Sequence, residues 1–289
     1  MKLRLQFPIT IVFSMLFLPL VAQSGWVRQP GDYYFKVGYS SFRSQNYFDT
    51  LGLRVPGVQA FNQQAIFLYG EYGLAKSFAL TLNWAPWRAN RYANTPWVTG
   101  IGDPMLEIKY ALPLPFAASL GLAAELPLGN ADLSTQDDAV PPNAIILPTG
   151  DGEWNYLATL AFSHSLTPEP AYIQGFVQFN YRTNYQGLDF QNQFRYGLEI
   201  GYRFGEKLWA NAALRGQRLS GRRDGPVGDF TRGDGTTFNQ LHLGFSWNFW
   251  RSLNLTFDME NYASWFEDQR NLYSGSVLLF GMAFTPKSD

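Results

Sequence analysis

The chain has 289 residues but no cysteine, only two histidines and few charged side chains. The absence of cysteine excludes disulfides, zinc–thiolate sites and thiol nucleophiles. Charged residues make up 16% of the chain, well below the roughly 25% of an ordinary soluble domain. The formal net charge is −1, so the basic surface expected of a nucleic-acid-binding protein is missing, and we expect no nucleic-acid partner.

Aromatic residues, in contrast, are abundant. They form 17% of the chain, with 9 Trp, 16 Tyr and 24 Phe, a composition that argues against disorder. Beyond the first 23 residues no apolar run has the length and continuity of a membrane helix. The nearest, 110–124, is broken by Pro113 and Pro115 and is better explained as a hairpin.

The first residues have the pattern of a secretory signal. Lys2 and Arg4 precede an apolar run over 7–22 that is interrupted by proline and ends among small residues. This predicts a signal peptide over 1–23 and a single mature domain over 24–289, located beyond the inner membrane. An N-terminal anchor helix is the alternative, disfavoured because the run is short and broken.

The rest of the chain alternates with period two, the pattern of strands with two different faces. In 192–204, for example, one face carries Phe194, Tyr196, Leu198, Ile200, Tyr202 and Phe204, and the other is polar or glycine. The pattern predicts twelve strands, at about 32–43, 63–74, 77–87, 101–112, 116–128, 153–165, 171–182, 191–204, 207–218, 238–249, 252–263 and 275–285.

The links between these strands alternate between tight turns and long polar loops. Short turns at one rim and long loops at the other are typical of outer-membrane barrels. We therefore expect an all-β, antiparallel, up-and-down transmembrane barrel of about twelve strands in the outer membrane of a Gram-negative cell. Its long loops would be extracellular and its short turns periplasmic. A secreted soluble β-sandwich or β-barrel remains the alternative, because its strands would alternate too.

Several short motifs resemble those of a known family. They are Glu71–Leu74, Gly100–Asp103, Leu106–Tyr110, Glu125–Gly129 and Pro148–Trp154. In this order and spacing they resemble the outer-membrane family named for the meta-pathway of phenol degradation, whose members are transporter barrels of about this length. The resemblance implies passive uptake of aromatic or other apolar small molecules.

The same motifs also have structural explanations, which we expect to hold. Gly100 and Gly102 would relieve a bend where the fourth strand begins. Asp103 and Asp151 would satisfy backbone amides in turns.

An enzyme is not expected, and an integral outer-membrane hydrolase is a less favoured alternative. His164 and Ser165 are neighbours in a strand and point to opposite faces. His242 and Ser246 lie four residues apart along a strand, too far for a hydrogen bond, so His242 is expected to line the lumen. No cofactor or metal motif is present, and we expect neither.

Charged inward positions suggest a polarised lumen, with arginines from the seventh to ninth strands facing acids from the second, fourth, fifth and eleventh. The leading function is a channel or transporter for small, apolar or aromatic molecules; a non-transport structural or surface-interaction barrel is the alternative. Expected partners are outer-membrane lipids, lipopolysaccharide, the barrel-assembly machinery and the cargo. The predicted lumen-lining residues are Phe176, Arg182, Arg195, Arg203, Trp209, Arg215, Glu107, Lys109, Glu125, His242, Asp258 and Glu260.

Overall fold

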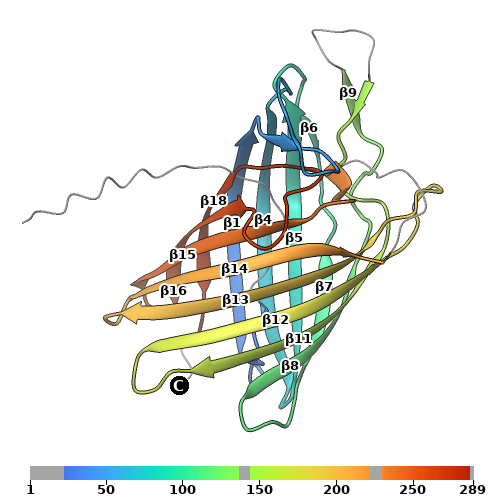
Figure 1. Cartoon of the computed structure of the whole chain (residues 1–289). Coiled ribbons are helices and arrows are strands. Elements are labelled where there is room, and N and C mark those ends of the chain that lie inside the picture. The colour runs from blue at the N-terminus through green and yellow to red at the C-terminus, as the bar shows by residue number, and fades with distance from the viewer. Residues whose placement is uncertain (1–22, 137–143, 222–229, 287–289) are drawn as a thin grey trace, which may run out of the picture.

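The computed structural model describes residues 23–136, 144–221 and 230–286. Twelve long strands form one closed antiparallel barrel, because the last of them pairs with the first (Figure 1). In ring order they are β1 (Tyr33–Ser44), β4 (Phe61–Ala75), β5 (Phe78–Tyr92), β7 (Met105–Ala111), β8 (Ala117–Glu125), β11 (Asn155–Ser165), β12 (Ala171–Arg182), β13 (Asn192–Phe204), β14 (Leu208–Ser220), β15 (Phe238–Trp250), β16 (Leu253–Ala263) and β18 (Ser276–Phe284).

The predicted fold is therefore confirmed: all twelve expected strands are present, each within a few residues of its expected bounds. The remaining elements are short and lie in the loops: β2 (Tyr47–Phe48), β3 (Arg54–Val55), β6 (Val98–Gly100), β9 (Ser134–Gln136), β10 (Ala144–Ile146), β17 (Leu272–Tyr273) and the 3-10 turn η1 (Phe230–Arg232). No helix among the described residues has the length and apolar character needed to cross a membrane.

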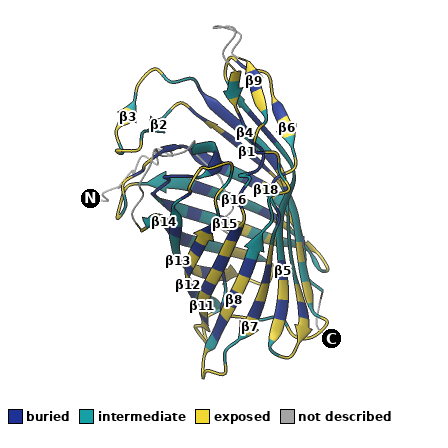
Figure 2. Ribbon diagram, turned by 90° about the vertical axis from the view of Figure 1, so that its right-hand side faces the viewer, coloured by how far each residue is buried: buried dark blue, intermediate teal, exposed yellow. Residues whose placement is uncertain are grey.

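The two faces of each strand differ as the alternation predicts. Along β11, residues are buried and exposed in turn from Asn155 to His164. Figure 2 shows the same chequered pattern on β5, β8 and β11. The outward positions are large and apolar, and Leu122, Ile108 and Phe280 are each more than half exposed. An uncharged outer belt on a closed barrel suits a bilayer, where every backbone polar group must be paired within the protein.

The two rims also differ. At one rim, which we call the short-turn end, links such as 76–77 and 251–252 are only two residues long, and both ends of the barrel chain lie there. At the other rim, the long-loop end, links reach 16 residues in 45–60 and 29 in 126–154. The loops carry the extra short strands, including the three-stranded sheet β17–β2–β3.

The wall is least regular at β7 and β8, which are shorter than the predicted 101–112 and 116–128. Pro104 immediately precedes β7 and Pro127 follows β8, and proline cannot donate to a ladder. At the long-loop ends of β7 and β8, the Asp103 carboxylate links two loop segments instead. It accepts hydrogen bonds from the backbone N–H of Gly129 (2.6 Å) and of Asp151 (2.7 Å). Asp103 thus satisfies backbone amides as expected, but those of two other loop segments rather than of its own turn.

Candidate solute path through the barrel lumen

The segment Gln23–Asp32, which we call the N-terminal segment, lies against the inner wall of the short-turn half. Gly73 exchanges backbone hydrogen bonds with Gly31 and Asp32. Inward side chains of four strands then hold the segment: Glu71 to Arg28 (3.0 Å), Lys109 to the Trp26 carbonyl (3.2 Å), Ser119 to the Ser24 carbonyl (3.0 Å) and Ser163 to the Gly25 N–H (2.8 Å). The segment thus runs along the inner wall from β4 to β12–β14, where Gln23 lines a small pocket with Gln174 and Arg215.

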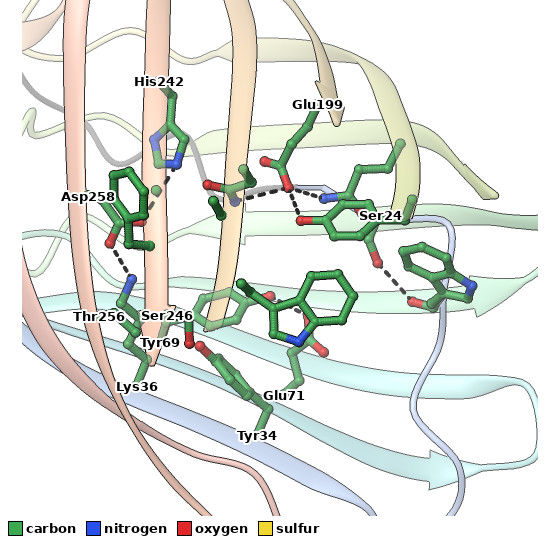
Figure 3. Close-up of a pocket in the computed structure, with 18 of the residues that line it drawn as sticks. Ser24, Tyr34, Lys36, Tyr69, Glu71, Glu199, His242, Ser246, Thr256 and Asp258 are labelled. Atoms are coloured by element: carbon green, nitrogen blue, oxygen red, sulfur yellow. Dashed lines mark hydrogen bonds and ion pairs between the residues drawn. The ribbon is translucent and has the colours of Figure 1, made fainter. Parts of the chain in front are cut away.

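Beside this segment a cavity of about 880 Å³ occupies the short-turn half of the lumen. Its walls combine aromatic rings with charged groups, as Figure 3 shows. Trp26, Tyr172 and Trp209 form a row of ring contacts, with centroids 5.8 and 5.7 Å apart. The cavity is also lined by Tyr34, Phe67, Tyr69 and Phe245. A space of this size and mixed character fits a small molecule with an apolar body and a polar group.

Two acids on β16 organise one wall of the cavity. Asp258 accepts a hydrogen bond from Lys36 on β1 (2.7 Å), and His242 Nε2 lies 3.6 Å from it. Glu260 contacts His242 Nδ1 (3.2 Å) and Arg215 (3.1 Å). In Figure 3, Lys36, Asp258 and His242 point toward one another across three strands. Each acid is therefore neutralised by neighbouring basic groups rather than by a group across the lumen.

Further along the same side of the barrel, a similar arrangement surrounds Glu199 on β13. Its carboxylate accepts hydrogen bonds from Tyr172 (2.7 Å) and Gln174 (2.8 Å), and Arg215 lies 3.4 Å away. Arg215 therefore bridges two acids, Glu199 and Glu260. Arg203, near the short-turn rim, forms no ion pair among the described residues and stacks over Trp209, 5.7 Å from its ring centroid.

The charged side chains that line the cavity give it a net negative charge. Six acids line it against four permanent bases, a difference of −2 with His242 neutral. The acids are Asp32, Glu71, Glu169, Glu199, Asp258 and Glu260, and the bases are Arg28, Lys36, Arg203 and Arg215.

The long-loop half holds a much smaller pocket, of about 90 Å³, with the opposite sign. Four arginines line it, Arg88, Arg182, Arg195 and Arg232, against only two acids, Glu125 and Asp151, a difference of +2. Arg182 is the most firmly held of the four. It is buried, binds Glu153 through two of its nitrogens and lies 3.8 Å from Asp151.

The pocket is roofed by residues Phe230–Thr237, which we call the plug. Wall side chains hold the plug by its backbone: Arg182 donates to the carbonyls of Arg232 (2.7 Å) and Gly233 (3.1 Å), Gln193 to that of Gly233 (2.9 Å), and Gln217 to that of Thr236 (3.2 Å). Phe230 adds an apolar anchor, packing on Phe61, Tyr47 and Tyr273 at centroid distances of 5.1 to 5.6 Å. The long-loop end of the lumen is therefore covered.

The structure places the predicted lumen residues on the inner face, but not all in one space. Arg215, His242, Asp258, Glu260, Trp209 and Arg203 line the large cavity, and Arg182, Arg195 and Glu125 line the small pocket. Glu107 and Lys109 line neither, and Lys109 instead holds the N-terminal segment. Phe176 is buried and packs on Gly197, so it fills the lumen instead of facing the large cavity.

The predicted division into a basic arc and a facing acidic wall is modified by acids within the arc. Glu199, an inward position of the strand pattern that we expect to pair locally, lies beside Arg215, and Glu153, which the pattern did not select, lies beside Arg182. Arg88, the plug and the N-terminal segment were also missed, because they lie beyond a predicted strand end or in links with no periodic pattern. The only signal for them was composition: polar loops that nevertheless contain Phe230 and Trp26.

Comparison with known proteins supports the fold and goes no further. No family model and no curated protein matches this chain. Among solved structures, an outer membrane channel from Pseudomonas putida F1 aligns with a TM-score of 0.61 at 13% identity, covering 93% of this chain and 99% of that one. The NanC porin aligns with a TM-score of 0.50 at 10% identity, covering 86% and 99%. At such identities the likeness shows that this chain shares the closed barrel fold of these proteins.

Proposed function

We propose that the protein is an outer-membrane barrel that provides a passive path for small molecules with an apolar body and a polar group. The short-turn end would face the periplasm and the long-loop end the cell exterior, the usual orientation of such barrels. The outward apolar belt would contact lipid. The observation that carries the proposal is the cavity of about 880 Å³, in which aromatic rings and ion pairs line one continuous space.

The physical basis is a match between wall and solute. The exposed faces of Trp26 and Trp209, 39% and 37% accessible, offer ring surface to an apolar body. Hydroxyl, amide and charged groups beside them can take the polar group. The two solved structures that share this fold are a channel and a porin, which agrees with a transport role. The resemblance to the phenol meta-pathway family suggests aromatic cargo in particular.

The direct test is reconstitution into liposomes, with uptake of phenol compared with that of a neutral sugar of larger size. We expect phenol to enter faster than through protein-free liposomes, and the sugar to be excluded. Trp209→Ala should lower phenol uptake several-fold because a stacking surface is lost. Trp250→Ala is the matched control, since Trp250 faces outward at the short-turn end. Uptake indistinguishable from protein-free liposomes would contradict a transport function.

A second candidate, a structural or surface-interaction barrel, is favoured by one observation: the plug covers the long-loop end. If it is correct, neither the intact protein nor a variant without the plug should pass solutes.

A further inference from the structure

The pocket beneath the plug has features that a merely filled lumen would not need. It is bounded by the wall strands β4, β5, β8, β11, β12, β13, β14, β15 and β16 and by the plug. Its volume of about 90 Å³ corresponds to roughly six to nine water molecules, since one needs about 10–15 Å³ of such space. By the same comparison, a solute of roughly four to eight non-hydrogen atoms would fit.

Two of the four arginines in this pocket donate hydrogen bonds to neutral groups only. Arg195 donates through Nε to the Gln217 side-chain oxygen (2.9 Å) and through Nη2 to that of Gln193 (2.8 Å). Arg88 donates through Nη1 to the Thr149 carbonyl (3.1 Å). Neither forms an ion pair among the described residues, in contrast to Arg182. A guanidinium carries five N–H donors, so most donors of both groups are left for other partners.

The plug supplies a third incompletely used guanidinium. Arg232 is only 6% exposed, and its Nη1 is buried with no hydrogen-bond partner in the described structure. Its other terminal nitrogen donates to the Ala131 carbonyl (2.8 Å) and lies 3.6 Å from the exposed carboxylate of Asp132. A buried donor without a partner costs free energy. The same residue lines the pocket, so a bound acceptor could satisfy this donor.

The surrounding charges limit what such an acceptor can be. Glu125 and Asp151 also line the pocket, which gives it a net charge of +2 when the four arginines are counted. The Glu153 carboxylate paired with Arg182 lowers this balance to +1, which complements a monoanion better than a multivalent anion. A planar carboxylate matches the fork of a guanidinium with two parallel bonds, which a spherical halide cannot do.

From this geometry we infer that the pocket beneath the plug is a binding site for a small monocarboxylate, held by Arg195 and Arg88 from the wall and by Arg232 from the plug. This deepens the proposed function, on which it rests in treating the lumen as a solute path. It assigns the carboxylate, rather than the apolar part of a solute, to the long-loop half. The large cavity below, with its net negative charge and aromatic rings, would take the apolar body.

The test is an NMR titration of acetate against the folded barrel in nonionic detergent at low salt. Acetate signals should broaden in a saturable way, and choline at equal concentration should not broaden. Addition of chloride in slight excess should leave acetate bound. Displacement by equimolar chloride, or equal binding of phosphate, would overturn the carboxylate assignment.

Three variants identify the site. Arg195→Gln and, separately, Arg88→Gln should each weaken acetate binding about tenfold, the usual scale for losing charge-assisted hydrogen bonds. Arg195→Lys should recover part of the loss, since it keeps the charge but not the fork. Arg218→Gln is the matched control, because Arg218 is on the exposed face of β14. Heat-dependent gel migration verifies that each variant is a folded barrel.

The outcomes separate this inference from the proposed function. Acetate binding that depends on Arg195 and Arg88, without phenol uptake, would keep the site and reject transport. Phenol uptake without saturable acetate binding would keep transport and reject the site. Binding that persists unchanged in both glutamine variants places the anion elsewhere and also rejects the site.

Discussion

The two halves of the lumen are built on the same wall and yet differ in size and sign. The short-turn half holds about 880 Å³ lined by aromatic rings with a charge difference of −2, and the long-loop half about 90 Å³ with a difference of +2. The strands that form the wall run through both halves. The difference therefore comes from what enters the lumen: a short N-terminal segment below, which follows the wall, and a plug above, which roofs it.

Barrel closure determines the wall and leaves the path through it to other segments. Closure satisfies backbone hydrogen bonds and sets the inward positions. It does not decide whether an inward arginine is neutralised. Arg182 and Arg195 come from neighbouring strands, but only Arg182 meets a carboxylate, because the loop before β11 places Glu153 beside it.

Removing the plug should have the largest effect on the difference between the two halves of the lumen. Replacing 230–237 by a flexible Gly-Ser linker should open the long-loop half and raise single-channel conductance several-fold, because the bonds from Arg182, Gln193 and Gln217 then hold nothing over the lumen. Planar-bilayer recording measures this. The control replaces 264–268, an exposed loop segment whose Trp265 and Phe266 are 57% and 72% accessible. Equal conductance in the plug variant and the wild type would mean that the lumen is closed elsewhere.

A single substitution should produce a smaller version of the same effect. Glu153→Gln leaves the buried Arg182 guanidinium without its closest anionic partner. Breaking a buried pair typically costs about 3–5 kcal/mol, and Arg182 also carries the plug. We expect the barrel to unfold at a lower temperature, as measured by gel migration, and we expect added protease to cleave the plug faster. Asp268→Asn controls for loss of an exposed pair, since Asp268 meets Arg270 at 3.1 Å in the solvent. Unchanged melting and cleavage would show that the plug is held without this pair.

Most of the fold, and part of the path, could be predicted from the sequence, for a physical reason. Period two is imposed by the strand itself, so the inward positions of Arg195, His242 and Asp258 follow from local pattern. Contacts such as Arg182 with Glu153 join residues from separate elements, and no local pattern reports them. The plug and the N-terminal segment lack the period-two pattern, since many of their backbone groups bond to wall side chains rather than to a neighbouring strand.

The net negative charge of the large cavity can be reduced by a substitution at one exposed position. Glu169 lines the cavity at its rim and is exposed, so Glu169→Gln removes one negative charge without breaking an ion pair among the described residues. Cation preference should fall slightly. The reversal potential should change by a few millivolts, on the order expected for the loss of one screened surface charge. Glu206→Gln is the matched control, because Glu206 lies in the next short turn and does not line the cavity. An equal shift in both variants would show that the effect is not specific to the cavity.

The smallest expected effect concerns Asp103, which joins the loop segments above β7 and β8 and so supports the long-loop half. Burial raises the pKa of this carboxyl above its usual 3.8, even though the Asp151 and Gly129 backbone amides favour the charged form. A raised pKa in the folded state means that the stability from this group is present below about pH 3.8 and is lost as the pH rises through the folded-state pKa.

Asp103→Asn should remove this pH dependence and also one of the two accepted bonds, since an amide has only one acceptor oxygen. We expect the loop 126–154 to loosen by about 0.5–1.5 kcal/mol, the usual net contribution of one hydrogen bond. Hydrogen exchange of the Gly129 and Asp151 amides measures the effect directly. Both should be protected in the wild type and one should exchange faster in the variant, whereas amides of β15, on a distant part of the wall, should not change. Unchanged protection of both amides at every pH would mean that these loop segments, including Asp151 at the small pocket, are held in place without Asp103.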